Sequence, residues 1–242
     1  MNLSAKQLIM QLYYLLSPKL QCLMLRIFFW KRPSVGRGVY MHPSVQILGK
    51  AFVHIGDNTV IGQDGWLNVN HRHGDGFSIQ VGNNCFIGRR NFFSSGKKII
   101  LGDFVLTAND CFFLGSSHVV SDPMVPYMIT GTTENDEITI GHNTFIGAGV
   151  RIVGNVHVGH GCVIGAGSII LKDIPPFSQV YGSPAQVRRR YSFFHKKWVP
   201  LEDFTEKDEA LIMDSDNYLK LLKKYPAPRM PYIASGGDMG HC

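Results

Sequence analysis

Two polar segments of the sequence contain residue types that could do chemistry. Segments 68–80 and 114–139 between them supply His71, His73, His118, Asp122, Glu134 and Asp136. An imidazole titrates near neutral pH and can take a proton from a reacting group, so general-base catalysis is the chemistry to consider. A histidine in a loop is also commonly an ordinary surface residue. The elements that position these side chains therefore decide between the two interpretations.

An apolar residue at every sixth position organises the chain around these segments. The positions are Val35, Met41, Ile47, Ile55, Ile61, Leu67, Val81, Ile87, Phe93, Leu101, Thr107, Phe113, Ile140, Ile146, Ile152, Val158, Ile164 and Ile170. Only Thr107 among them is not clearly apolar. A period of six fits neither a helix nor a simple alternating strand, and it predicts short strands separated by turns and stacked as a solenoid. Three hexads would close one triangular coil.

Small residues recur four positions after the apolar ones, and glycine follows many of the apolar residues. The small set is Thr59, Gly65, Cys85, Val105, Cys111, Thr144, Val150, Val156, Cys162 and Ser168. We expect a second inward position of limited volume there, because interiors are close-packed, and we expect glycine to permit the bend at the corners. The three cysteines in this set are therefore interpreted as buried packing thiols.

The six-residue spacing is interrupted by additional residues after every third hexad in the first part of the repeat. These insertions follow Ile47, Leu67, Phe93 and Phe113. All insertions should therefore leave the prism at one corner, where the loops stack. This arrangement would bring segment 68–80 beside segment 114–139. Function on repeat scaffolds usually sits in such loops, held by a rigid frame.

Length and composition bound the domain organisation. The 242 residues include 26 Gly and 45% hydrophobic residues, which suits an ordered β-rich solenoid with appendages. We expect an N-terminal helical segment 1–34, a β-helix 35–174 and a C-terminal extension 175–242 that contains a helix. The net charge is +6, from 24 basic and 18 acidic residues. Nucleic acid is disfavoured as a partner because no recognition helix, zinc finger or stacking-aromatic pattern accompanies the basic residues.

Residues 3–30 predict two short apolar helices separated by Pro18. Neither helix reaches the length of a membrane span, and the start lacks a signal-peptide cleavage pattern, so we expect a cytoplasmic protein without a span. Two interpretations of residues 3–32 stay open. They cap the first coil, or they make peripheral contact with the inner face of a membrane through Phe28, Phe29 and Trp30.

The sequence after the last hexad predicts a change of structure. Pro175 and Pro176 predict the end of the repeat, because consecutive prolines cannot continue strand pairing. A turn at 181–185 and a basic run at 188–190 follow. The stretch 204–225 predicts a helix, for which Thr205 and Asp208 provide a start signal.

The hexads, the loop sequence Gly115-Ser116-Ser117-His118 and the closing motif (Lys172–Pro176, then Gly182–Ala185) resemble those of the hexapeptide-repeat acyltransferases. The most similar branch is that of the O-acetyltransferases of galactosides, maltose and bacterial surface polysaccharides. The resemblance covers about residues 35–190. It implies a mainly β fold, namely a left-handed parallel β-helix, in a homotrimer with active sites between subunits. It also implies acetyl-CoA as the donor and a carbohydrate hydroxyl as the acceptor.

By its place in the motif, His118 matches the catalytic base of that family. A sugar hydroxyl is a poor nucleophile until its proton is removed, and we expect direct attack on the thioester without a covalent enzyme intermediate. Asp122 or Glu134 would orient this histidine. Asn91 resembles an asparagine that helps to hold the acceptor hydroxyl, and an internal polar ladder is its alternative role.

Further residues are expected to contact the two substrates. His71 and His73 would contact the acceptor, together with aromatic rings such as Trp66 that can pack on a sugar. The resemblance places the pantetheine arm against backbone at two small residues and the CoA phosphates at two cations, which are Ala148, Ala166, Lys172 and Arg189. Two departures weaken this assignment, because the family often has Trp where this chain has Phe145 and Arg where it has Gln186.

Three other functions stay open on the sequence. An N-acetyltransferase acting on an amino sugar or a xenobiotic amine shares the fold. A γ-class carbonic anhydrase would bind zinc through three histidines, two of them five residues apart, but His118 has no such neighbour, and His157 and His160 are three apart. No metal is therefore expected at these positions. His71 and His73 could also bind a metal, but two histidines that flank one arginine are more typical of contact with a substrate or with solvent, so no metal is expected there either. A non-catalytic scaffold is the third alternative.

Overall fold

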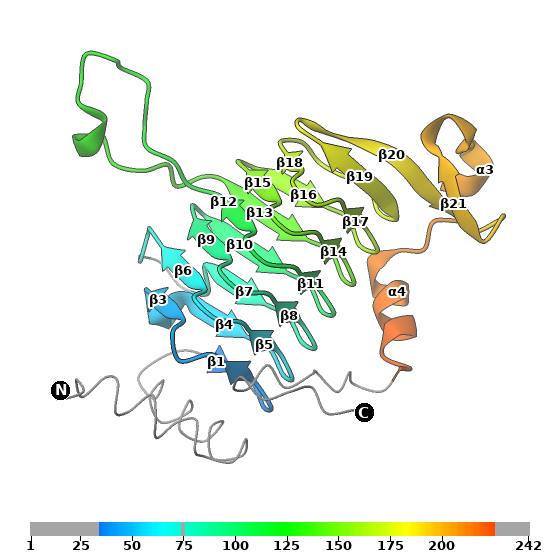
Figure 1. Ribbon diagram of the computed structural model, residues 1–242, viewed down its shortest axis with the longest axis horizontal. Helices are drawn as coiled ribbons and strands as arrows, with labels where there is room; N and C mark the ends of the chain where they lie inside the picture. Colours follow the sequence, from blue (N-terminus) through cyan, green and yellow to red (C-terminus); the bar gives the residue numbers. More distant parts are fainter. Residues whose placement is uncertain (1–33, 74–75, 226–242) are drawn as a thin grey trace, which may run out of the picture.

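The computed structural model describes residues 34–73 and 76–225, which form a solenoid of short strands followed by a smaller C-terminal unit (Figure 1). The predicted N-terminal helices, with their capping or membrane role, lie outside the described residues, as do Cys22 and Cys242. Among the residues that are described, no helix is both long enough and apolar enough to cross a membrane.

Three parallel sheets form the faces of the solenoid. Sheet A consists of β1 (Ser34–Val35), β4 (Val53–Ile55), β7 (Ile79–Val81), β10 (Lys98–Leu101), β13 (Glu137–Ile140) and β16 (Val156–Val158). Sheet B begins with β2 (Tyr40–Met41), β5 (Val60–Ile61), β8 (Phe86–Ile87), β11 (Leu106–Thr107), β14 (Phe145–Ile146) and β17 (Val163–Ile164). Sheet C consists of β3 (Gln46–Leu48), β6 (Trp66–Val69), β9 (Phe92–Ser95), β12 (Phe112–Leu114), β15 (Arg151–Val153) and β18 (Ile169–Ile170). The chain visits A, B and C in turn, so the strands wind as a parallel β-helix, and the predicted left-handed fold of hexapeptide repeats is confirmed.

The strand registers align the hexad residues in three columns, one per sheet. In sheet B the successive partners are Met41, Ile61, Ile87, Thr107, Ile146 and Ile164. These side chains are buried and fill the interior together with the corresponding columns of sheets A and C. In sheet C the rings of Phe93 and Phe113 stack with centroids 4.5 Å apart and planes 6° from parallel. The six-residue period is therefore the period of the core, as predicted.

The small residues that follow each hexad position are also buried, which confirms a second inward position. Three of them are the free thiols of Cys85, Cys111 and Cys162. Burial raises the pKa of the Cys85 thiol to about 12 and the pKa of each of the other two to about 11. They stay protonated at neutral pH and act as packing groups.

Glycine at the corners is required by close approach of successive coils. A Cβ atom on Gly88 would lie 2.4 Å from the carbonyl oxygen of Ala108 in the next coil. No side chain fits at that distance, so the bend is available only to glycine.

The insertions leave the solenoid at the corner between sheets C and A, as predicted. The first contains the 3₁₀ turn η1 (Lys50–Phe52), the second comprises residues 70–78, and the longest comprises residues 115–136 with the 3₁₀ turn η2 (Tyr127–Ile129). The longest insertion projects away from the prism (green in Figure 1). We call it the long loop, and we call residues 70–73 the corner loop.

The C-terminal unit extends sheet B instead of ending it. Strand β19 (Ser178–Gly182) pairs in parallel with β17, and β20 (Ala185–Ser192) and β21 (Lys197–Pro200) add antiparallel strands. The expectation that strand pairing ends at Pro175 and Pro176 is therefore wrong. These prolines lie between Ile174, which bridges to Val158 in sheet A, and the start of β19, so they occupy a corner where the ladder needs no N–H group.

Two short helices replace the single predicted one. After the 3₁₀ turn η3 (Leu201–Asp203), α3 spans Glu206–Glu209 and α4 spans Ser215–Leu222. The start signal is confirmed, because the Thr205 N–H donates a 3.0 Å hydrogen bond to the Asp208 carboxylate at the beginning of α3. Helix α4 covers the corner between sheets A and B, where Asn143 donates a hydrogen bond to the hydroxyl of Tyr218 (Figure 1).

Candidate active site

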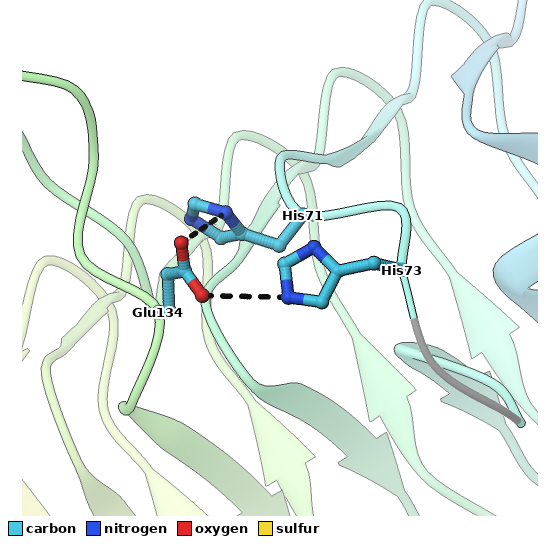
Figure 2. A group of neighbouring side chains, drawn as sticks. All are labelled: His71, His73 and Glu134. Atoms are coloured by element: carbon cyan, nitrogen blue, oxygen red, sulfur yellow. Dashed lines mark ion pairs between the residues drawn. The ribbon is translucent and has the colours of Figure 1, made fainter.

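The corner loop and the long loop meet at the corner between sheets C and A. The Nε2 atom of His71 lies 3.1 Å from the carbonyl oxygen of Thr133 and 3.1 Å from the hydroxyl of Thr132. Glu134 lies between His71 and His73 (Figure 2). The prediction that the two polar segments lie side by side is confirmed, because both leave the prism at the same corner.

His118 stands at the base of the long loop on a short antiparallel ribbon. Its backbone forms a bridge with Thr132, and the flanking hydrogen bonds run from Thr133 N to Ser117 O (2.7 Å) and from Val119 N to Gly131 O (3.2 Å). The side chain of His118 is exposed. The ribbon places the backbone of this histidine directly opposite Thr132, whose hydroxyl contacts His71, so the two histidines belong to one cluster of loops.

Neither predicted carboxylate orients His118. Asp122 accepts a 2.9 Å hydrogen bond from the backbone N–H of Met124 and closes a turn in the long loop. The Glu134 carboxylate instead contacts His71 at 3.2 Å and His73 at 3.4 Å. Within residues 34–73 and 76–225, no carboxylate forms an ion pair with His118. The orienting role that the sequence suggested for Asp122 or Glu134 is corrected accordingly.

Asn91 lies inside the solenoid and not at the acceptor site, so its catalytic assignment is also corrected. The residue is 1% exposed. Its amide nitrogen donates to the carbonyl oxygens of Gly88 and Ala108, both at 3.1 Å, and to the hydroxyl of Thr107 at 2.6 Å, while its amide oxygen accepts from Cys111 N at 2.6 Å. The internal polar ladder is the role that this geometry supports.

Trp66 lies on the outer face of sheet C, in the strand that leads into the corner loop. Its ring is 42% exposed and packs on Phe92 with centroids 4.9 Å apart, and Phe92 contacts Phe112 at 6.4 Å. The guanidinium of Arg151 covers the Phe112 ring at 5.2 Å and ends the row. Trp66 is thus the exposed end of an aromatic row on the outer face of sheet C.

The predicted donor residues occupy a different corner of the prism. Ala148 and Ala166 are exposed and stack in the last two turns between sheets B and C, where Gly167 N donates to Ala148 O at 2.8 Å. A Cβ atom on Gly149 or Gly167 would meet no atom within 4 Å. This corner therefore presents bare backbone to solvent, which an extended thiol arm could approach.

The cations predicted for the CoA phosphates lie near the same end of the solenoid. Lys172 follows the last strand of sheet C, and Arg189 lies in β20 at the extended edge of sheet B. Both side chains are exposed. The geometry leaves them available to an anionic ligand.

The repeat itself matches a known family model. Residues 137–172 match the model described as bacterial transferase hexapeptide (six repeats). This stretch of the chain carries the hexapeptide repeat of that transferase model. A probable acetyltransferase of Mycobacterium tuberculosis is 30% identical to this chain over 158 residues, covering 63% of this chain and 48% of that protein. A galactoside O-acetyltransferase of Escherichia coli is 32% identical over 140 residues, covering 53% and 62% respectively.

Solved structures of similar fold include AntD, an N-acyltransferase from Bacillus cereus in complex with dTDP and 3-hydroxybutyryl-CoA. The two chains have a TM-score of 0.59 at 17% identity, over 83% of this chain and 96% of AntD. At this identity the likeness establishes the fold. The chain spans about half the length of the first curated relatives it matches, which are covered to 48% and 41%.

The basic run of this hexapeptide-repeat chain is not a single anion site. Arg190 is 6% exposed, forms an ion pair with Glu209, donates to Pro176 O at 3.1 Å and lies 4.3 Å from the Phe204 ring centroid. Arg189 faces the opposite side of β20, because side chains alternate along a strand. One arginine therefore anchors the C-terminal unit, while its neighbour stays exposed.

Two site residues were missed by reasoning from the sequence. Thr132 and Thr133 hold His71 and bridge the backbone at His118 and Ser117. Small polar residues are common in loops and these carry no distinctive spacing. Only the pairing of the two ends of the long loop reveals them.

Proposed function

We propose that this chain is an acetyl-CoA-dependent O-acetyltransferase that acts on a hydroxyl of a sugar in a glycan or surface polysaccharide. The observation that carries the proposal is the placement of His118. Its backbone is fixed by the ribbon at the base of the long loop, its side chain is exposed, and it stands beside the polar corner loop. Sugar acetyltransferases among the relatives support the choice of acceptor.

In the proposed reaction His118 acts as the general base. Its imidazole takes the proton of the acceptor hydroxyl while the oxygen attacks the acyl carbon, and the same proton then returns to the departing thiolate. Acetyl-CoA supplies an activated thioester, so one C–O bond forms as one C–S bond breaks. Backbone N–H groups near the corner would stabilise the oxyanion that develops during the attack. Trp66 would pack on the apolar face of the sugar ring.

The donor would bind along the corner marked by Ala148 and Ala166. The bare backbone there fits a pantetheine arm, and Lys172 and Arg189 provide exposed cations for the phosphates. The acyl-CoA in the AntD complex supports this class of donor.

We further propose a homotrimer. Base and donor corners lie on opposite edges of sheet C, so they would meet most simply between neighbouring chains. The long loop also carries exposed apolar side chains, with Met124 at 88%, Met128 at 92% and Ile129 at 74% exposure. A monomeric protein rarely exposes such a cluster, and a neighbouring subunit would cover it.

An N-acyltransferase is the second candidate, favoured by the solved structures of similar fold. One AntD variant was solved with dTDP-4-amino-4,6-dideoxyglucose and coenzyme A. The acceptor atom separates the two candidates. A panel of galactosides, maltose, nucleotide sugars, amino sugars and amines, assayed with acetyl-CoA, would show whether an alcohol or an amine is acetylated.

His118→Ala tests the catalytic assignment. We expect kcat/KM for the best acceptor, measured by release of the CoA thiol, to fall by about 10²–10⁴-fold, because the hydroxyl loses its proton acceptor. His195→Ala is the matched control, since His195 is an exposed histidine in the turn between β20 and β21. Turnover by His118→Ala at the wild-type rate would refute the assignment.

A further inference from the structure

Three potential metal ligands converge beside the proposed base. Nδ1 of His71, Nε2 of His73 and a carboxylate oxygen of Glu134 all lie within 4.8 Å of one another (Figure 2). The carboxylate stands between the rings, with one oxygen 3.2 Å from His71 and the other 3.4 Å from His73. These ligands come from two loops that are more than sixty residues apart in sequence.

The hydrogen bonds of His71 indicate that a proton or a metal ion lies between its other ring nitrogen and Glu134. Its Nε2 atom faces the carbonyl oxygen of Thr133 at 3.1 Å, and a carbonyl oxygen only accepts, so Nε2 carries a hydrogen. The other ring nitrogen then directs its lone pair at the Glu134 carboxylate unless a proton or a metal ion lies between them. A histidine whose second N–H donates to a backbone carbonyl is the usual arrangement of a metal ligand.

We propose that His71, His73 and Glu134 form a binding site for a divalent transition metal ion of the zinc class. Two imidazoles and one carboxylate suit Zn²⁺ and disfavour Ca²⁺ and Mg²⁺, which prefer oxygen ligands. Ligand atoms about 2.0–2.1 Å from a tetrahedral zinc lie about 3.3 Å from each other, close to the 3.2 Å between His71 Nδ1 and one oxygen of Glu134. Rotation of the His73 side chain, which is 72% exposed, closes the remaining gap.

The site goes beyond the proposed transferase activity, because the ion would act as a clip between loops. Glu134 follows Thr132 and Thr133, whose backbones pair with His118 and Ser117. Binding would therefore tie the corner loop to the ribbon that presents the base. The three protein ligands leave a fourth position for water or for a group of the acceptor. The sequence had led us to expect contact with a substrate or with solvent at His71 and His73, because these two histidines flank one arginine.

Metal binding can be measured without any acyl transfer, so the outcome is independent of the proposed function. The full chain without an affinity tag is stripped with EDTA and titrated with ZnSO₄ by calorimetry, and Co²⁺ is added in a parallel sample to record its visible absorption. We expect one Zn²⁺ per chain, a Co²⁺ spectrum typical of tetrahedral coordination, and a higher melting temperature with metal.

Variants of the exposed ligands make the test specific. His73→Ala and Glu134→Gln should each weaken Zn²⁺ binding by more than about tenfold and abolish the Co²⁺ spectrum, with unchanged circular dichroism. His195→Ala should bind like the wild type. Absence of Zn²⁺ binding to the stripped wild type, or unchanged binding in both ligand variants, would overturn the proposal.

Discussion

At the scale of single residues, the one polar member of the hexad pattern is accounted for by a hydrogen bond to a second buried polar side chain. Thr107 is the only member of the repeat that is not clearly apolar, and Asn91 is a polar residue in a position otherwise filled by small groups. The two side chains bond to each other at 2.6 Å inside the solenoid, and the Thr107 hydroxyl also accepts from Gly88 N at 3.1 Å. Buried polar groups are tolerated when all of them have partners, as here.

Asn91→Ala should destabilise the fold while leaving the active site intact. The change leaves the Cys111 N–H without its 2.6 Å acceptor, which we expect to cost about 1–3 kcal/mol of unfolding free energy. Urea denaturation measures this loss, and Gln46→Ala, an exposed amide in sheet C, is the control. We expect kcat/KM per folded molecule to stay at the wild-type value. A fall in kcat/KM without a loss of stability would contradict the structural role and indicate that Asn91 contacts the acceptor.

At the scale of elements, one buried carboxylate helps to join helix α3 to strand β20 in the C-terminal unit. Asp208, at the start of α3, accepts hydrogen bonds from the hydroxyl of Ser192 in β20 and from the N–H and hydroxyl of Thr205. The Ser192 hydroxyl is the chief cause that lowers the pKa of Asp208 to about 2. The same strand carries Arg189, so this contact also holds the predicted phosphate ligand in place.

Asp208→Asn should destabilise the protein in a pH-dependent manner. A carboxylate whose pKa is lower in the folded than in the unfolded chain stabilises the fold above about pH 4, and this contribution is lost as the pH falls towards about 2. The wild type should therefore melt at a higher temperature than Asp208→Asn at pH 7, and the two curves should converge in acid. Glu202→Gln, an exposed carboxylate in η3, is the control. A pH-independent difference would contradict the assigned cause.

At the scale of the whole molecule, the prism places the proposed base and the proposed donor groove at different corners. His118 and the corner loop belong to the corner between sheets C and A, whereas Ala148 and Ala166 belong to the corner between sheets B and C. The width of sheet C lies between them. A site built from the base of one chain and the donor groove of its neighbour resolves this separation, and closed symmetry would repeat it around the assembly.

Mixed assemblies test this arrangement. His118→Ala removes the base and Ala166→Trp blocks the donor groove, so each pure variant should be inactive. If each site combines residues of two chains, subunits of the two variants that are mixed by unfolding and refolding should recover roughly a quarter of wild-type activity, since half of the bases and half of the grooves are intact. Light scattering should give three times the monomer mass for the wild type and for both variants. Recovery no higher than in separately refolded variants would place the whole site on one chain.

The sequence by itself determined the solenoid, because a six-residue period leaves only one way to bury an apolar side chain in each strand. It also determined which corner carries the insertions, since these fall after every third hexad, and it placed the three buried thiols. Only the tertiary structure decided which polar residues are functional candidates. Asn91 lies inside the coil, where its side chain has four hydrogen-bond partners. Glu134 contacts His71 and His73 and not His118. Pro175 and Pro176 lie at a corner, where they do not interrupt strand pairing. Hexad spacing fixes a residue's height and face along the prism, but the direction of a loop side chain depends on contacts between segments that the spacing does not encode.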